Sequence, residues 1–247
     1  MTRFSSPTQA VEVLVAAFRA RKGVFRQRIN IEDWVPQNLN KDQKAMFLFL
    51  TSVLDYGMKS TILYRGAQKL FADDPEFLQP EILAGFENRK EKLASLLLAY
   101  LHVRFPNEAA IRWSSNCQLL LERFEGRVLR IFKERSALKV LENIYLFRGF
   151  GKKTGHLFFR SVVNTFSLEY PDIDQVLMPI DRHKLRLTYQ WGFIGKQDYQ
   201  RQNRGKVAEI WKKACRQAGI SWLEFDRAFW IWGSMQSLNK ENLMRSY

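Results

Sequence analysis

The sequence predicts an all-α protein. Apolar residues recur at helical spacing in nearly every segment, and no run of alternating β-branched residues is long enough to indicate a sheet. The chain has 247 residues, of which 46% are hydrophobic, so it can bury a core of its own. We expect a single unit over residues 1–247, made of two interleaved helical lobes that short turns join.

Helix start signals predict two helices in the N-terminal part of the chain. Ser6 followed by Pro7 is typical of an N-cap and the first helical position, so a helix is expected to begin there. Asp42 is expected to cap a second helix, whose apolar residues between positions 46 and 54 predict a central place in the core.

The middle of the chain predicts two further helices. Residues 90–102 are amphipathic, and Phe105-Pro106-Asn107 is expected to end that helix. Ser114 or Ser115 is then expected to cap the next helix, which runs towards Phe132.

Five helices are expected beyond this point. Ser136 should cap the first, which ends where a glycine-containing turn begins, and residues 152–166 form the second. Pro179 requires an extended approach, so Asp181 is expected at the start of another helix. The last third predicts helices over residues 206–218 and 222–234.

The charge balance indicates a polyanionic partner. The 39 Lys and Arg residues outnumber the 25 Asp and Glu residues, which gives a formal charge of +14. Cations placed on phosphates release condensed counterions, so nucleic acid is the leading partner and an anionic membrane surface the lesser one. Cys117 and Cys215 show no metal-ligand spacing, and with three His residues we expect no zinc site, iron–sulfur cluster or other metal centre.

No segment reaches the ~18 uncharged apolar residues of a membrane span, and the N-terminus has no signal-peptide pattern. We therefore expect a soluble cytoplasmic protein without a membrane partner, associated with the nucleoid if its source is prokaryotic. A monomer with no obligate protein partner is expected.

The turn from Phe147 to Gly151 carries the most specific signal. Two glycines, Gly149 and Gly151, lie between two amphipathic helices, where they permit a tight turn and let backbone N–H groups approach a phosphate. Phe147 and Phe150 are expected to anchor the turn in the core, and Gly155 to let the two helices approach closely. The alternative is a glycine C-cap followed by an ordinary helix.

Residues 146–156 (LFRGFGKKTGH) and 178–183 (MPIDRH) together resemble the helix-hairpin-helix DNA glycosylase superfamily, with the hairpin motif spanning about residues 138–166. They look most like its archaeal 8-oxoguanine DNA glycosylase branch. The resemblance implies a two-lobed helical fold with the active site between the lobes. It also implies a base-excising enzyme of DNA repair that flips its target base and has associated β-lyase (AP lyase) activity.

The same resemblance assigns roles to individual residues. Lys153 is the expected nucleophile, which must be neutral to attack the sugar, and Asp181 the carboxylate that stabilises the positive charge developing there. Backbone contacts with DNA are expected from Gly149, Gly151, Arg148, Lys152, Arg182 and His183. The base pocket is expected to include Asp226, Trp230, Tyr56 and Tyr64. No cofactor is implied, although a monovalent cation at the hairpin is compatible with the motif.

Two other functions remain open on the sequence. The N-terminal half does not follow the archaeal branch, so the enzyme could remove a different modified base or act on modified nucleosides, for instance bulky bases in foreign DNA. A non-catalytic helix-hairpin-helix module would use the hairpin for backbone contacts alone. Only the enzyme requires both Lys153 and Asp181.

Overall fold

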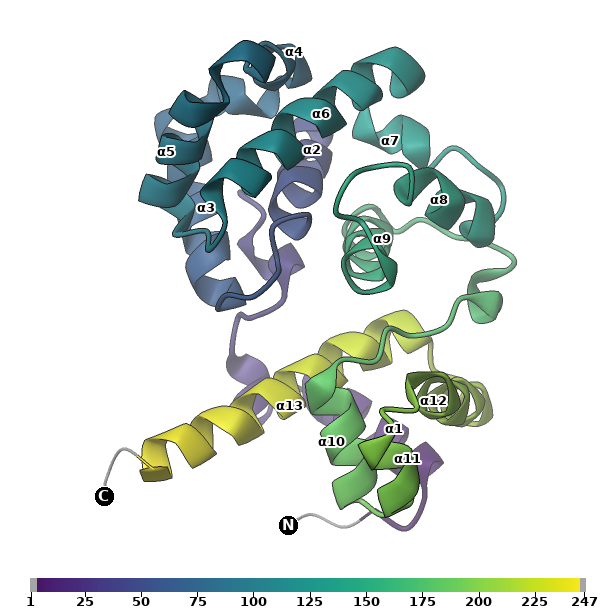
Figure 1. Ribbon diagram of the computed structural model, residues 1–247. Helices are drawn as coiled ribbons and strands as arrows, with labels where there is room; N and C mark the ends of the chain where they lie inside the picture. The colour runs from purple at the N-terminus through teal and green to yellow at the C-terminus, as the bar shows by residue number, and fades with distance from the viewer. Residues whose placement is uncertain (1–3, 245–247) are drawn as a thin grey trace. The chain divides into compact units, whose positions relative to one another are not determined.

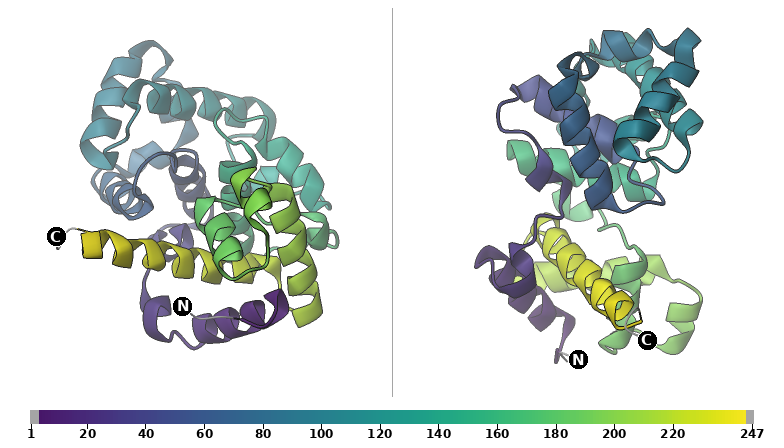
Figure 2. Two further views of the ribbon diagram at one scale, coloured as in Figure 1. Left: turned by 60° about the horizontal axis from the view of Figure 1, so that its bottom comes forward. Right: turned by 90° about the vertical axis from the view of Figure 1, so that its left-hand side faces the viewer.

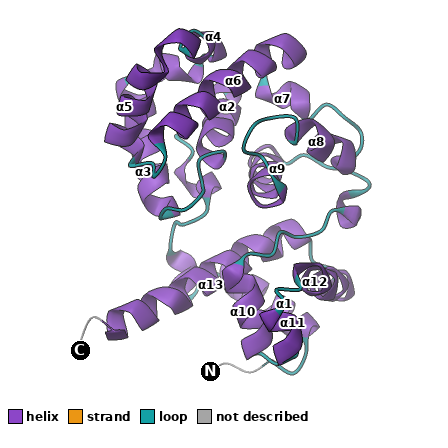
Figure 3. Ribbon diagram, in the orientation of Figure 1, coloured by secondary structure: helices purple, strands orange, loops and turns teal. Residues whose placement is uncertain are grey.

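The computed structural model describes residues 4–244, with side chains up to residue 235. No strand occurs among these residues, so the all-α prediction is confirmed (Figures 1 and 3). The chain divides into two compact units. Unit 1 combines the residues up to Asn30 with those from Asp174 onward, and unit 2 comprises Ile31–Ile173.

Unit 2 is built from eight α-helices and several short 3₁₀ turns. Helix α5 packs between α3 and α6, and α2 packs against α9 (Figures 1 and 2). The ring of Phe49 forms the centre of the core beside the hairpin, with ring centroids 5.0, 5.4 and 5.5 Å from Phe147, Phe150 and Phe158. The α-helices are α2 (Lys41–Ser52), α3 (Ser60–Asp73), α4 (Pro80–Ala84), α5 (Lys90–Leu101), α6 (Pro106–Phe124), α7 (Val128–Ile131), α8 (Ala137–Ile144) and α9 (Lys152–Phe166).

Unit 1 packs its helices around tryptophan and phenylalanine side chains. Trp211 is fully buried, and its ring lies 4.9 Å from Phe229 and 5.1 Å from Phe225. Helix α13 contacts α1, α10 and α12, so it is the element on which this unit is assembled. The helices are α1 (Pro7–Arg19), α10 (Arg182–Gln190), α11 (Lys196–Gln200), α12 (Arg204–Ala218) and α13 (Trp222–Met244).

Local signals located some helix starts correctly. The hydroxyl of Ser6 accepts a hydrogen bond from the backbone of α1, and Ser136 does the same for α8. The prediction for α2 was wrong by two residues, because Asn40, and not Asp42, is the N-cap. Asn40 accepts from the backbone N–H of Gln43, whose side chain accepts in return from the N–H of Asn40, so both of these amides are satisfied.

The prediction for α6 was also wrong. Pro106 begins this helix, so Ser114 and Ser115 lie in its interior, where the Ser115 hydroxyl donates to the carbonyl of Ile111 at 2.7 Å. A proline needs no N–H partner at the first helical position, which makes it a start signal as well as a stop signal. The helix ends well before Phe132, because Glu125 adopts a left-handed conformation with φ of 52°.

No helix within residues 4–244 is both long enough and apolar enough to cross a membrane.

Candidate functional site

The hairpin joins α8 to α9 in unit 2 and is anchored in the core by two phenylalanine side chains. Phe147 and Phe150 are 2% and 3% exposed, and the N–H of Phe150 donates to the carbonyl of Phe147 at 3.2 Å. The expected anchoring by the two phenylalanines is confirmed. It leaves the backbone between them on the outside of a rigid aromatic core.

The glycines of the motif have different tasks. Gly149 has φ of +88°, and a Cβ there would lie 2.9 Å from Arg112, so no other residue fits without strain. A Cβ on Gly155 would lie 2.9 Å from the Tyr145 ring, which confirms the expected close approach of α8 and α9. Gly151 has ordinary backbone angles and open space around its Cβ position. The fold therefore does not require glycine at this position, but an approaching phosphate would benefit from the missing side chain.

Gly151 is the N-cap of α9, and Thr154 fixes the turn in place. The Thr154 hydroxyl accepts from the N–H of Gly151 at 3.2 Å and donates to the carbonyl of Gly149 at 2.7 Å. The first amides of a helix have no carbonyl partner within the helix, so they can bind an anion. Lys152 and Lys153 follow directly and are exposed. This end of α9 has the chemistry of a phosphate-binding site.

Lys153 lies beside a fixed backbone carbonyl. Its amine is 3.5 Å from the carbonyl oxygen of Asp55, in the segment that connects α2 and α3. The Asp55 carboxylate is buried and accepts hydrogen bonds from the hydroxyls of Ser60, at 2.8 Å, and Tyr64, at 2.6 Å. Lys153 is an exposed residue, and the backbone segment that its amine contacts is held from the interior by the buried Asp55 carboxylate.

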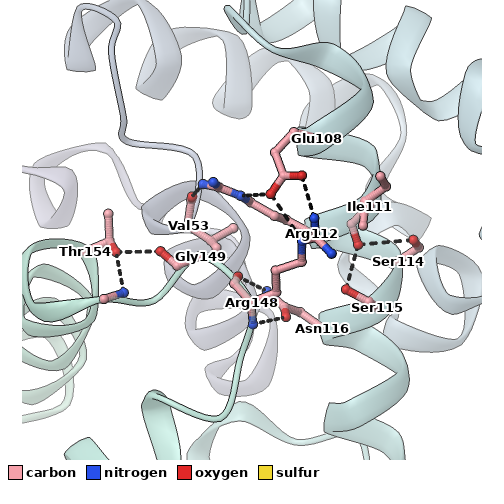
Figure 4. Close-up of polar contacts among 11 residues, drawn as sticks. Val53, Glu108, Ile111, Arg112, Ser114, Ser115, Asn116, Arg148, Gly149 and Thr154 are labelled. Atoms are coloured by element: carbon pink, nitrogen blue, oxygen red, sulfur yellow. Dashed lines mark hydrogen bonds and ion pairs between the residues drawn. The ribbon is translucent and has the colours of Figure 1, made fainter.

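Helix α6 clamps the hairpin from the other side (Figure 4). The Asn116 side chain accepts from the N–H of Arg148 at 2.8 Å and donates to the carbonyl of the same residue at 3.0 Å. Arg112 donates to the carbonyl of Val53 at 3.1 Å and covers Gly149. One helix therefore holds the hairpin and also the end of α2.

The Arg148 side chain is engaged within the protein. Glu108 forms ion pairs with Arg148 at 2.8 Å and with Arg112 at 2.9 Å. The hydrogen bond from Arg148 is the main reason why the pKa of Glu108 is lowered, with a further hydrogen bond from Arg112. A contact from Arg148 to a phosphate would have to compete with this carboxylate. Sequence analysis missed Glu108, Arg112 and Asn116, because nothing in the local pattern of α6 indicates a partner in the hairpin.

In unit 1, Asp181 caps α10 as predicted. Its carboxylate accepts from the N–H of Lys184 at 2.9 Å, and its side chain is half-buried. Pro179 precedes it in the loop that enters the helix, and the Lys184 amine donates to the carbonyl of Pro179 at 2.8 Å. Asp181 is thus positioned by its hydrogen bond to the first turn of α10 and by the Lys184 side chain, which binds the loop before it.

Lys184 also forms a buried ion pair with Asp226 on α13, and both residues are at most 3% exposed. The prediction that Asp226 lines the base pocket needs correction, because its carboxylate is enclosed and bound to Lys184. A buried charge requires such a partner to offset its lost hydration. The pair fastens the Asp181 loop to the central helix of unit 1.

Other predicted residues of unit 1 lie near this loop. Arg182 is exposed, and the His183 ring packs edge-on against the partly exposed Trp230 with centroids 5.6 Å apart. A Cβ on Gly233 would lie 3.0 Å from His183, so α10 and α13 approach closely here. Trp230 is partly exposed, and its place in the base pocket stays a prediction. Trp232 stacks on Phe25.

The two tyrosines expected in the pocket differ. Tyr56 is 60% exposed in the α2–α3 connection, whereas Tyr64 is 2% exposed with its hydroxyl on Asp55. Burial, and then the Asp55 carboxylate, raise the pKa of Tyr64. The prediction for Tyr64 was wrong, because its ring is buried in the core of unit 2 and its hydroxyl supports the Asp55 carboxylate. Among the described residues, no group of His, Cys, Asp and Glu side chains is arranged to hold a metal ion.

The described residues form an all-helical fold in which the hairpin joins α8 to α9. One solved structure that shares it is the 8-oxoguanine DNA glycosylase of Methanocaldococcus jannaschii, with a TM-score of 0.56 and 16% sequence identity. The alignment covers 90% of this chain and 92% of that one, so the predicted resemblance in fold is confirmed. A scan against models of protein families and a search of curated proteins each found no match.

Proposed function

We propose that this protein is a DNA glycosylase with β-lyase activity, in which Lys153 is the nucleophile and Asp181 the essential carboxylate. The observation that carries the proposal is the exposed Lys153 side chain in the first turn of α9, directly after a hairpin whose helix-terminal amides suit an anion. The backbone of the hairpin and Lys152 hold the phosphates, which fixes the DNA strand relative to this amine. The likeness in fold to an 8-oxoguanine DNA glycosylase favours oxidised guanine as the base.

The chemistry follows from these groups. The neutral Lys153 amine attacks C1′ of the deoxyribose, and the bond from C1′ to the base breaks, so the base leaves with the electron pair and takes up a proton. Asp181 stabilises the positive charge on the sugar during this step, as a preorganised carboxylate in a desolvated site does best. Ring opening gives a Schiff base on Lys153. Loss of a C2′ proton then breaks the C3′–O bond and nicks the strand.

The remaining cationic residues suit DNA as the partner. Arg182 follows Asp181 directly, Lys152 precedes Lys153, and the formal charge of the chain is +14. Affinity for DNA should therefore fall steeply as salt rises.

The test is single-turnover base release from duplexes that each contain one candidate base, with 8-oxoguanine first and bulky modified pyrimidines included. We expect release from one of them, and a loss of about 10²-fold or more in Asp181→Asn. Glu12→Gln, at an exposed position of α1 in the same unit, serves as a matched control that also converts a carboxylate to an amide. Background release from every duplex by a protein that still binds DNA would leave only a binding module.

A further inference from the structure

A basic segment of unit 1, residues 19–28 (RARKGVFRQR), has no part in the chemistry above. Half of its ten residues are Lys or Arg, and no Asp or Glu occurs between Glu12 and Glu32. Like charges held this close repel one another, so the segment favours an anionic partner that neutralises them.

Carboxylates of the protein neutralise only part of this charge. Glu224 forms an ion pair with Arg19 at 2.6 Å. Arg21, Lys22 and Arg26 are exposed, and none of them pairs with a carboxylate among residues 4–235, whose side chains the structure describes. These three residues, the basic cluster, are therefore available to a ligand.

The backbone of the cluster is fixed to the core of unit 1. Phe25, in the 3₁₀ turn Gly23–Arg26, is 5% exposed, and its ring stacks on Trp232 of α13 with centroids 6.1 Å apart. Arg21 adopts a left-handed conformation with φ of 48°, and its carbonyl accepts a hydrogen bond from Nε of Arg26 at 3.3 Å. A partner would meet cations on a preorganised main chain, which lowers the entropy cost of binding.

Within unit 1, helix α13 lies between this segment and the Asp181 loop (Figure 2). On one side Phe25 packs on Trp232, and on the other side the His183 ring contacts Trp230 with centroids 5.6 Å apart. A helix with its side chains is roughly 10–12 Å wide, which corresponds to about three base-pair steps of about 3.4 Å. A duplex with its target sugar at Asp181 would thus bring a phosphate a few nucleotides away to the basic cluster.

The segment suits a nucleic-acid backbone better than a membrane surface. Its one aromatic residue, Phe25, is buried, so the exposed side chains are mainly cationic and offer no large apolar group to insert among lipids. Lys and Arg contacts with phosphates fix the position of a duplex and read no base sequence.

We propose that the basic cluster, formed by Arg21, Lys22 and Arg26, binds phosphates of the DNA about three nucleotides from the target sugar. The inference rests on the proposed function for its ligand, DNA. It adds a second backbone contact, located in unit 1, to the one that the hairpin makes from unit 2. This contact supplies affinity and takes no part in breaking the bond to the base.

The experiment measures affinity of the full-length protein for a labelled duplex with a tetrahydrofuran abasic-site analogue, by fluorescence anisotropy between about 50 and 200 mM salt. In the cluster variant, Arg21→Gln/Lys22→Gln/Arg26→Gln, the slope of log Kd against log salt should fall by about 2–3, since each lost phosphate contact removes about 0.9. The urea midpoint should stay that of the parent, because all three side chains are exposed.

Two further variants serve as controls. Arg21→Lys/Arg26→Lys keeps both charges and should keep the slope of the parent. A second triple variant removes the same charge from exposed positions of α12 and should retain most of that slope: Arg204→Gln/Lys213→Gln/Arg216→Gln.

The position of the contact is tested with duplexes cut back to two base pairs on one side of the analogue. For one of the two sides, the parent and the cluster variant should bind equally well, because the phosphates that the cluster binds are gone. A difference between them on both shortened duplexes would overturn the proposed position.

Equal slopes for the two glutamine triple variants would overturn the proposal, since the effect would then be one of net charge alone. Weaker binding of the cluster variant to phosphatidylserine vesicles, with unchanged affinity for DNA, would assign the cluster to a membrane and overturn it too. The tetrahydrofuran sugar cannot form a Schiff base, so the readout does not depend on Lys153. Absence of base release with the expected slopes would count against the proposed enzyme alone, whereas failure of the parent to bind DNA would overturn both.

Discussion

The hairpin of unit 2 and the Asp181 loop of unit 1 are held by opposite means. Asn116 holds the hairpin through neutral hydrogen bonds to the backbone of Arg148, and Gly149 supplies the left-handed turn. The Asp181 loop depends on a buried charge, Lys184, which binds Pro179 and Asp226. Removing a neutral hydrogen-bonding side chain lowers the free energy of unfolding modestly, whereas removing one member of a buried ion pair lowers it much more. The two regions should therefore differ in their sensitivity to mutation.

The largest effect is expected when one member of the buried pair is removed. Lys184→Met removes the amine that binds the buried Asp226 carboxylate and should lower the free energy of unfolding by about 3–5 kcal/mol. Urea unfolding followed by circular dichroism measures this change. The double variant Lys184→Met/Asp226→Leu should recover most of the loss, and a double variant as unstable as the single one would show that the charge pair is not the cause.

Breaking the neutral clamp should cost less. Asn116→Ala leaves the N–H and carbonyl of Arg148 without a side-chain partner, which should lower stability by about 1–3 kcal/mol and weaken DNA binding. Ser115→Ala, the neighbouring position on α6, is the control, because that hydroxyl bonds only within its own helix. Equal DNA affinity in the two variants would show that the clamp does not position the hairpin.

Substitutions at the two glycines of the hairpin should have different effects, one on the stability of the fold and the other on DNA binding. Gly149→Ala meets both an unfavourable φ and Arg112, so it should destabilise the fold by about 1–2 kcal/mol. Gly151→Ala meets no atom within 4 Å and should leave the urea midpoint unchanged, but its methyl group should hinder a phosphate and reduce DNA affinity. If Gly151→Ala binds DNA as tightly as the parent, the hairpin backbone does not contact a phosphate at this position.

The smallest effect concerns pH. The pKa of Glu108 is lowered in the folded protein, so its contribution to stability is present above the unfolded pKa of about 4.3 and is lost as pH falls through the folded value. Glu108→Gln should cost at most about 1 kcal/mol at pH 7, since the carboxylate is partly solvated. The difference between variant and parent should shrink in acid. A difference that is constant down to about pH 3 would assign the effect to packing instead.

The parts of this molecule that were predictable from sequence are those set by short-range rules. Ser6, Ser136 and Asp181 cap helices because each offers a side-chain oxygen to an amide a few residues away. Asn40 was missed because Asp42 offers the same chemistry nearby, and Pro106 because a proline can stop one helix and start another.

The missed parts depend on contacts across the chain. Asn116 lies 32 positions from Arg148, and Lys184 lies 42 positions from Asp226. No local pattern distinguishes a buried, paired Asp226 from one that lines a pocket. Tyr64 shows the same limit, since only the folded structure places Asp55 beneath its hydroxyl.

The proposed function requires that Lys153 form a covalent bond with the sugar. Borohydride reduction during reaction with a cleavable duplex, followed by mass spectrometry of the protein peptides, tests it directly. We expect the adduct on Lys153, no adduct in Lys153→Gln, and an adduct retained in Lys152→Gln. An adduct that persists in Lys153→Gln, or one that maps to Lys152 in the parent, would show that Lys153 is not the nucleophile.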